Sequence, residues 1–238
     1  MIRLRGYLLP PMIAVAFVIF CTAIPMLAQQ DGLTVDVSNR AELISAVNSA
    51  RPGTTVRIAP GEYPGGLSFN TLRGTEANPI IIEAQDPARP PVFVGGGSGL
   101  HLRNPAHVHL RGIVLQGATG NGLNIDDGGR PGEPARGIHL DQVQVRDVGP
   151  RGNNDGIKLS GVDHFVLENC EVERWGDSGS AIDMVGCHNG EIKGCQFRHR
   201  GDIFGNGVQT KGGSADITIH HCRFENAGGR AVNIGGST

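Results

Sequence analysis

Polar side chains recur at matching places along this chain, and their chemistry suits contact with an anionic sugar polymer. Five segments of four residues share one pattern: a small residue, an apolar residue, a polar residue, and then an apolar residue or Thr. They start at Gly122, Gly156, Ala181, Gly207 and Ala231. Their third positions form a polar column, Asn124, Lys158, Asp183, Gln209 and Asn233. Because side chains alternate along a strand, we expect this column to project outward from neighbouring strands. Asn154 and Asp155 precede the second segment, Asp177 precedes the third, and Lys211 follows the fourth.

The spacing of these segments predicts the fold. Ile157, Ile182, Val208 and Val232 follow one another at 24 to 26 residues, and the longer step from Leu123 is explained by an inserted loop over 126–135. A strand that returns at this period is typical of a solenoid, in which stacked coils bury a face that no coil can bury alone. We therefore predict an all-β, right-handed parallel β-helix.

A second strand is expected in phase with the first. It covers 110–115, 140–145, 167–172, 192–197 and 219–224, with the first, fourth and sixth positions apolar. Cys170, Cys195 and Cys222 share the fourth position, so they should stack in one interior column. Buried packing is the favoured interpretation, and a disulfide between neighbouring coils is the alternative.

The N-terminal end carries a leader and a cap. Arg3 and Arg5, an apolar run and small residues up to Ala28 predict a secretory signal over 1–28, which places the β-helix at 29–238 in a secreted or periplasmic protein. Prolines within the run make a membrane anchor the weaker alternative. Asn39 and Glu42 form a capping-box pattern, and the short helix that follows should cover the first coil. No such lid follows Ile234, so a continuation beyond Thr238 is expected.

Composition excludes some partners. The formal net charge is −2, with 37 glycines and one tryptophan. A faintly acidic chain without basic runs argues against nucleic acid, and no membrane contact is expected after cleavage of the signal.

Two stretches resemble a known family. Residues 52–63 and 74–84, together with Gly99-Leu-His-Leu and His109-Leu-Arg-Gly-Ile-Val-Leu, are similar to the entry region of secreted β-helix polysaccharide lyases such as chondroitinase B, alginate lyases and pectate lyase-like proteins. The resemblance implies action on an acidic polysaccharide by β-elimination. That reaction needs a base and a cation that stabilises the developing charge.

The roles that follow are hypotheses. Lys158 is the candidate base. Asp155, Asp177 and Asp183 are candidate ligands of calcium, the one cofactor expected. The candidate substrate-binding residues are Asn124, Asn154, Gln209, Lys211 and Asn233. The competing interpretation is that Lys158 and Asp183 form an exposed cross-strand pair of small value.

Other functions were weighed against this one. Gly179, Ser180 and Asn206 stand where polygalacturonase-type hydrolases need aspartates and a histidine, so hydrolysis by paired carboxylates is disfavoured. His107, His109, His220 and His221 lack a third ligand at metal-site spacing. A non-catalytic carbohydrate-binding solenoid remains the alternative, with only Trp175 and Tyr63 as large aromatic surfaces.

Overall fold

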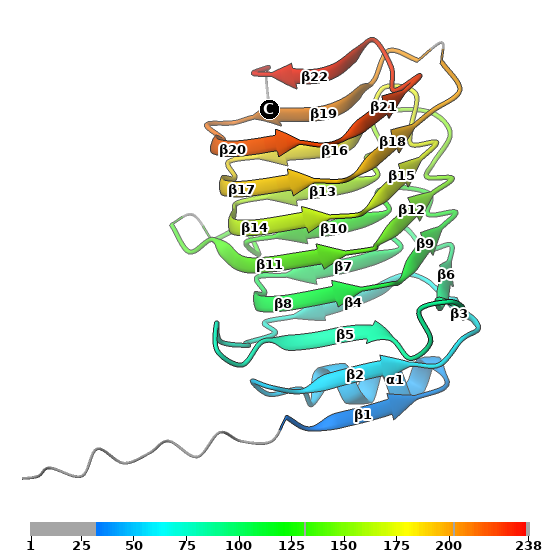
Figure 1. The fold of residues 1–238 in the computed structure, drawn as a ribbon, viewed down its shortest axis with the longest axis vertical. Helices are drawn as coiled ribbons and strands as arrows, with labels where there is room; N and C mark the ends of the chain where they lie inside the picture. The colour runs from blue at the N-terminus through cyan, green and yellow to red at the C-terminus, as the bar shows by residue number, and fades with distance from the viewer. Residues whose placement is uncertain (1–31, 131, 202, 237–238) are drawn as a thin grey trace, which may run out of the picture. The chain divides into compact units, whose positions relative to one another are not determined.

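A computed structural model describes residues 32–130, 132–201 and 203–236, all within the compact unit Asp31–Thr238. The predicted signal over 1–28 lies outside the described residues. In the part described, parallel strands form three sheets of eight, seven and seven strands (Figure 1). The predicted parallel β-helix is confirmed.

The three sheets run along the stack of coils. Sheet A contains β1 (Thr34–Val37), β2 (Thr55–Ile58), β5 (Ile80–Ala84), β8 (Ala106–Arg111), β11 (Ala135–Asp141), β14 (Val162–Glu168), β17 (His188–Lys193) and β20 (Ala215–His220). Sheet B contains β3 (Glu62–Pro64), β6 (Val92–Val94), β9 (Val114–Gln116), β12 (Gln144–Arg146), β15 (Glu171–Glu173), β18 (Gln196–Arg198) and β21 (Arg223–Glu225). Sheet C contains β4 (Leu67–Asn70), β7 (Leu100–Arg103), β10 (Leu123–Asp126), β13 (Ile157–Ser160), β16 (Ser180–Val185), β19 (Asn206–Lys211) and β22 (Arg230–Ile234).

Each predicted second strand in fact covers the end of one strand and the beginning of the next. Each of the five segments crosses the corner between sheets A and B, so a typical coil has three strands rather than two. The third residue of each segment has a positive φ, and these residues are Gly112, Gln142, Asn169, Gly194 and His221. A left-handed residue turns the chain there, which explains why the apolar positions are the first, fourth and sixth instead of the first, third and fifth.

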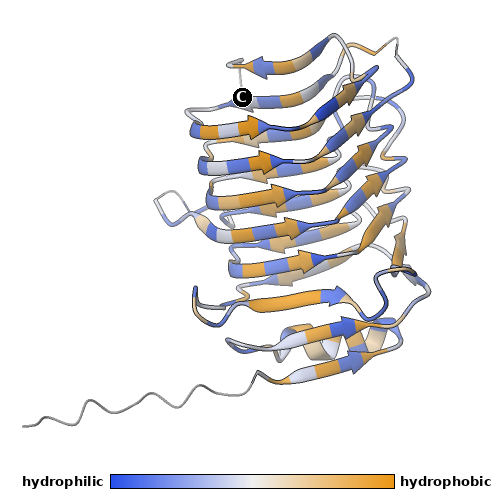
Figure 2. Ribbon diagram, in the orientation of Figure 1, coloured by the Kyte–Doolittle hydropathy of each residue, from blue (hydrophilic) through white to orange (hydrophobic). Residues whose placement is uncertain are grey.

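Alternating side chains fill the interior of the coils. Burial follows period two along most strands, as in β8 and β13, and Figure 2 shows apolar and polar residues alternating along the ribbon. Cys170 and Cys195 are buried at the A–B corner, Cys222 is partly buried, and all three are free thiols. The predicted role of these cysteines in packing is confirmed.

A short helix covers the first coils, as predicted. In α1 (Arg40–Asn48), the Asn39 side chain accepts a hydrogen bond from the Glu42 N–H at 3.0 Å. Leu43 and Val47 are fully buried in the core, against the strands β1 and β2 that α1 contacts. The cap therefore rests on the capping box and on one apolar stripe.

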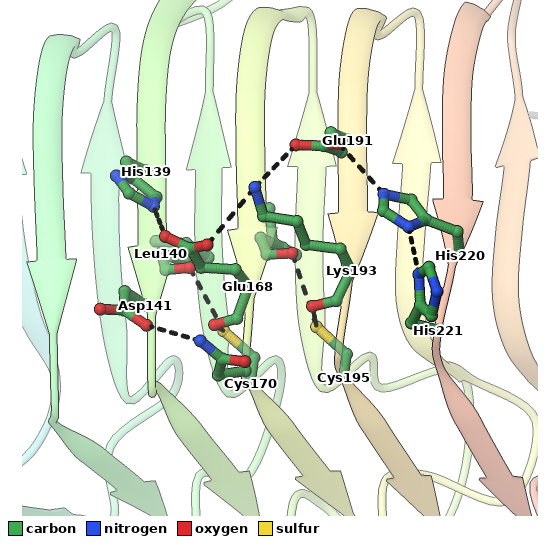
Figure 3. A network of polar contacts seen from close by, with 12 residues as sticks. His139, Leu140, Asp141, Glu168, Cys170, Glu191, Lys193, Cys195, His220 and His221 are labelled. Atoms are coloured by element: carbon green, nitrogen blue, oxygen red, sulfur yellow. Dashed lines mark hydrogen bonds and ion pairs between the residues drawn. The ribbon is translucent and has the colours of Figure 1, made fainter.

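A ladder of ion pairs crosses four coils of sheet A on its outer side. Figure 3 shows Lys193 between Glu168 and Glu191, with Nζ to carboxylate distances of 3.4 and 3.0 Å. His139 and His220 extend the ladder at its two ends, 2.6 and 3.0 Å from these glutamates. The side chains are about one quarter to two fifths exposed, so the ladder adds little stability per pair.

Candidate functional site

The predicted polar column lies on the outer side of sheet C. Parallel pairing of β7, β10, β13, β16, β19 and β22 aligns His101, Asn124, Lys158, Asp183, Gln209 and Asn233 in one row. Neighbouring strands of a sheet lie about 4.8 Å apart, so the row presents one polar group per coil along the direction of stacking. His101 extends the predicted column by one residue.

Lys158 and Asp183 form the centre of this row. Together with Asp155 and Lys211, whose charged groups reach them from outside the row, they make up what we call the lysine cluster. Lys158 Nζ contacts Asp183 Oδ2 and lies 3.6 Å from Asp155 Oδ2. Lys211 Nζ lies 3.3 Å from Asp183 Oδ1. The carboxylates are almost fully buried, whereas the side chains of Lys158 and Lys211 are 19% and 12% exposed. Solvent therefore reaches the ammonium groups and hardly reaches the carboxylates beneath them.

Burial increases the free-energy cost of removing one partner of the Lys158–Asp183 pair. The pair was expected to be exposed, yet Asp183 is only 1% exposed. Asp183 Oδ1 accepts no hydrogen bond of good geometry from a described residue, so its contact with Lys211 is electrostatic. Removal of one partner from a buried ion pair leaves an uncompensated charge and costs about 3–5 kcal/mol. The expectation of an exposed pair is therefore wrong, and loss of one partner should be costly.

Asp155 is held beneath the cluster by backbone contacts. Its carboxylate accepts a hydrogen bond from the Ser180 N–H, and its own N–H donates to Asn121 Oδ1, each at 2.9 Å. Burial raises the pKa of Asp155 to about 6, and the charge of Asp183 adds to the rise while Lys158 opposes it. Asp155 therefore exchanges a proton within about one pH unit of neutrality.

Amide groups border the cluster on the next coil. The Gln209 side-chain oxygen accepts hydrogen bonds from the Ser180 hydroxyl at 3.4 Å and from Asn206 Nδ2 at 3.3 Å. Asn206 Oδ1 is buried without a partner among the described residues. An unsatisfied buried oxygen is rare in native structures, so this border could accept a hydrogen bond from a bound hydroxyl.

A histidine–aspartate pair, missed in the sequence, lies on the other side of the cluster. His101 Nε2 is 2.6 Å from Asp126 Oδ2, and Asn124 Nδ2 donates to the same oxygen at 3.3 Å. The Gly128 N–H fixes the second oxygen of Asp126 at 2.8 Å. A carboxylate that orients one imidazole nitrogen leaves the other for proton transfer. The signal that could have found it was Gly99-Leu-His-Leu, which aligns with the column one coil before Asn124.

Two predicted residues do not join the cluster. Asp177 Oδ1 accepts hydrogen bonds from the Gly152 N–H at 2.7 Å and from the Ser178 hydroxyl at 3.1 Å, and these donors lower its pKa. Asn154 Nδ2 donates to the Arg151 carbonyl at 2.8 Å. Both side chains stabilise turns between sheets B and C. Asn233 lies at the end of the row beside Gln209.

The three aspartates do not fit a shared calcium site. Calcium takes six to eight oxygen ligands. Lysine ammonium groups contact the carboxylates of Asp155 and Asp183, and Asp177 caps a turn instead. No group of three or more His, Cys, Asp or Glu within the described ranges is arranged to hold a metal ion. Lys158 and Lys211 supply the positive charge beside the carboxylates of Asp155 and Asp183.

The fold and site define a class, the parallel β-helix proteins with a polar outer face. Residues 93–238 match the family described as Right handed beta helix region. This match covers more than half of the chain, which therefore belongs to that family. Residues 37–126 match Chondroitinase B, and the comparison with curated proteins gave no match.

Solved structures support the same fold. An alginate lyase from Paenibacillus sp. str. FPU-7 superposes with a TM-score of 0.70 at 18% identity, over 85% of this chain and 76% of that one. A rhamnogalacturonan lyase gives 0.61 at 14% identity, over 87% of this chain and 63% of that one. At these identities the likeness shows the fold. No helix among the described residues is long and apolar enough to cross a membrane.

Proposed function

We propose that this protein cleaves an acidic polysaccharide by lyase-type β-elimination on the outer face of sheet C. The observation that carries the proposal is the lysine cluster, in which two partly exposed lysines cover two buried carboxylates beside the His101–Asp126 pair. The match to Chondroitinase B and the lyase fold of the neighbouring structures support the substrate class. A secreted or periplasmic location, predicted from residues 1–28, would give access to such a polymer.

The reaction assigns a task to each group. Lys158 in its neutral form takes the proton from the carbon beside the uronate carboxylate, and Asp183, in contact with Lys158, is the acceptor for the proton that Lys158 must first lose. Lys211 stabilises the charge on the uronate carboxylate. The electron pair of the broken C–H bond forms the ring double bond, and the C4–O bond breaks. His101, oriented by Asp126, protonates the departing oxygen.

Non-catalytic carbohydrate binding is the second candidate, and one observation weakens it. Exposed aromatic rings are the usual platforms for sugar rings, yet the two rings expected to serve, Trp175 and Tyr63, are 1% and 4% exposed, and Phe204 is the exposed aromatic side chain among the described residues. Asn124, Gln209 and Asn233 remain to contact hydroxyl groups, and Asn154 is committed to its turn. The polar column can therefore position a chain, and the charged cluster within it is better explained by chemistry.

The test is product formation. The full-length protein would be incubated with pectate, alginate and chondroitin, each with calcium and with a chelator. The ultraviolet absorbance of the unsaturated uronate would be followed with time. A rise on any of these polymers is expected. Polymer shortening without new absorbance would show hydrolysis and reject the proposal, and binding without shortening would favour the second candidate.

A further inference from the structure

A second polar hollow lies on sheet A, away from the lysine cluster on sheet C. Its volume is about 450 Å³, within the range of small-molecule sites and more than a bare inorganic ion needs. Side chains from β8, β11 and β14 and from the loop before β5 line it. We call it the histidine pocket, after His107, His109, His139 and His164, which share it with Arg136 and Glu76.

Gly137 is required for the shape of this pocket. It has a φ of +64°, and a Cβ placed there would lie 2.4 Å from His107 Nδ1. His107 on β8 and His164 on β14 occupy the same position as Gly137 on the two neighbouring coils. Both also have a left-handed backbone conformation. The His107 ring therefore packs over bare backbone, a close approach that a side chain at position 137 would prevent.

The polar groups of the pocket favour an anion. No carboxylate of the described residues pairs with Arg136, and His109 Nδ1 is buried without a hydrogen-bond partner. Burial, then the charges of His139, Arg111 and His107, lower the pKa of His109 to about 4, so its imidazole is uncharged at neutral pH. His139 is held by Glu168, and His164 by Asp163 at 3.2 Å. A guanidinium with imidazole donors matches a carboxylate.

The remaining surface favours an organic anion. Val166, which is partly exposed, contributes apolar surface to the lining, and this surface suits the C–H face of a sugar ring. We propose that the histidine pocket binds the carboxylate of a sugar acid. The choice of a uronate rests on the proposed function, whereas anion binding by this pocket does not.

Imidazole NMR signals separate this pocket from the site on sheet C. The full-length protein would be titrated with galacturonate, with its uncharged methyl ester and with inorganic phosphate. His107, His139 and His164 report on the pocket, and His101 reports on sheet C. His199, which contacts the Trp175 carbonyl outside both sites, serves as the reference. We expect galacturonate to shift the pocket signals at concentrations where the ester and phosphate do not.

Two variants sharpen the test. Arg136→Gln should raise at least tenfold the galacturonate concentration that gives half of the full signal shift. Glu76→Gln removes the one acid of the lining, so this concentration should stay the same or fall. Unmoved pocket signals would overturn the inference, as would equal shifts with phosphate or with the ester. Shifts of His101 alone would support a saccharide site on sheet C and reject this second one, whether or not the protein cleaves polymers.

Discussion

At the scale of residues, the lysine cluster is held together by mutual neutralisation. Two acids that are almost fully buried share two lysines, and one acceptor, Asp183, serves both ammonium groups. Loss of Asp183 should lower the free energy of unfolding more than loss of Lys158 or Lys211 alone, because both ammonium groups then lose a paired carboxylate. Asp155 occupies a different position, since its nearest hydrogen-bond donor is backbone rather than lysine.

Asp183→Ala tests this dependence. We expect it to lower the free energy of unfolding by about 3–5 kcal/mol, the cost of breaking a buried pair, as measured by denaturant unfolding. Asp36→Ala is the matched control, because Asp36 pairs with Arg57 across strands in an exposed setting and its loss should change stability little. Equal effects of the two substitutions would contradict the burial argument.

Asp155 should make stability depend on pH in an unusual direction. Its folded pKa of about 6 lies above its ordinary value of 3.8, so the folded state holds the proton more tightly than the unfolded state. The contribution of this group is therefore fully present below about pH 4 and is lost as pH rises to 6, by about 3 kcal/mol in total. Asp155→Asn should remove that dependence in unfolding curves measured at pH 4, 5, 6 and 7. If the difference in free energy of unfolding between wild type and Asp155→Asn stays constant across this pH range, the raised pKa of Asp155 is refuted.

At the scale of elements, corners decide the architecture. The sequence repeat predicted strands of the right period and the column of sheet C, because alternation and spacing follow directly from residue order. The repeat did not separate sheets A and B, since each turn is made by a single left-handed residue whose type varies from coil to coil, as in Gly112, Gln142 and His221. The lysine cluster was only partly predictable. Lys158 and Asp183 share a row, whereas the reach of Lys211 to Asp183 depends on side-chain conformation.

Close coil packing leads to a prediction for Gly190. A Cβ there would lie 2.1 Å from Cζ of Phe165, a ring that is 1% exposed on the neighbouring strand. Gly190→Ala should therefore destabilise the fold by about 1–3 kcal/mol through overpacking, which a thermal melt would reveal. At Gly97 an added Cβ meets nothing within 4 Å. Gly97→Ala is therefore the control. Equal melting temperatures for the two variants would show that the space around Gly190 accommodates a methyl group, against the overpacking argument.

At the scale of the molecule, the two candidate sites lie on different sheets of the stack. Sheet A carries the ion-pair ladder and the histidine pocket, sheet B has short strands with mostly charged or amide outer side chains, and sheet C carries the lysine cluster and the His101–Asp126 pair (Figures 1 and 3). A polymer aligned along the stack would meet one polar group of sheet C per coil. Under the proposed function, this row of polar groups would hold an extended substrate along the stack of coils.

The most direct test of the central claim compares two lysines on different sheets. Formation of unsaturated uronate would be measured by ultraviolet absorbance for wild type, Lys158→Met and Lys193→Met, with folding checked by thermal melts. We predict that Lys193→Met, which alters only the ladder on sheet A, keeps the wild-type rate. The rate of Lys158→Met should be at least about 100-fold lower, as expected for loss of a general base. A folded Lys158→Met protein that retains the wild-type rate, or a wild-type protein that produces no unsaturated product from any of the three polymers, would contradict it.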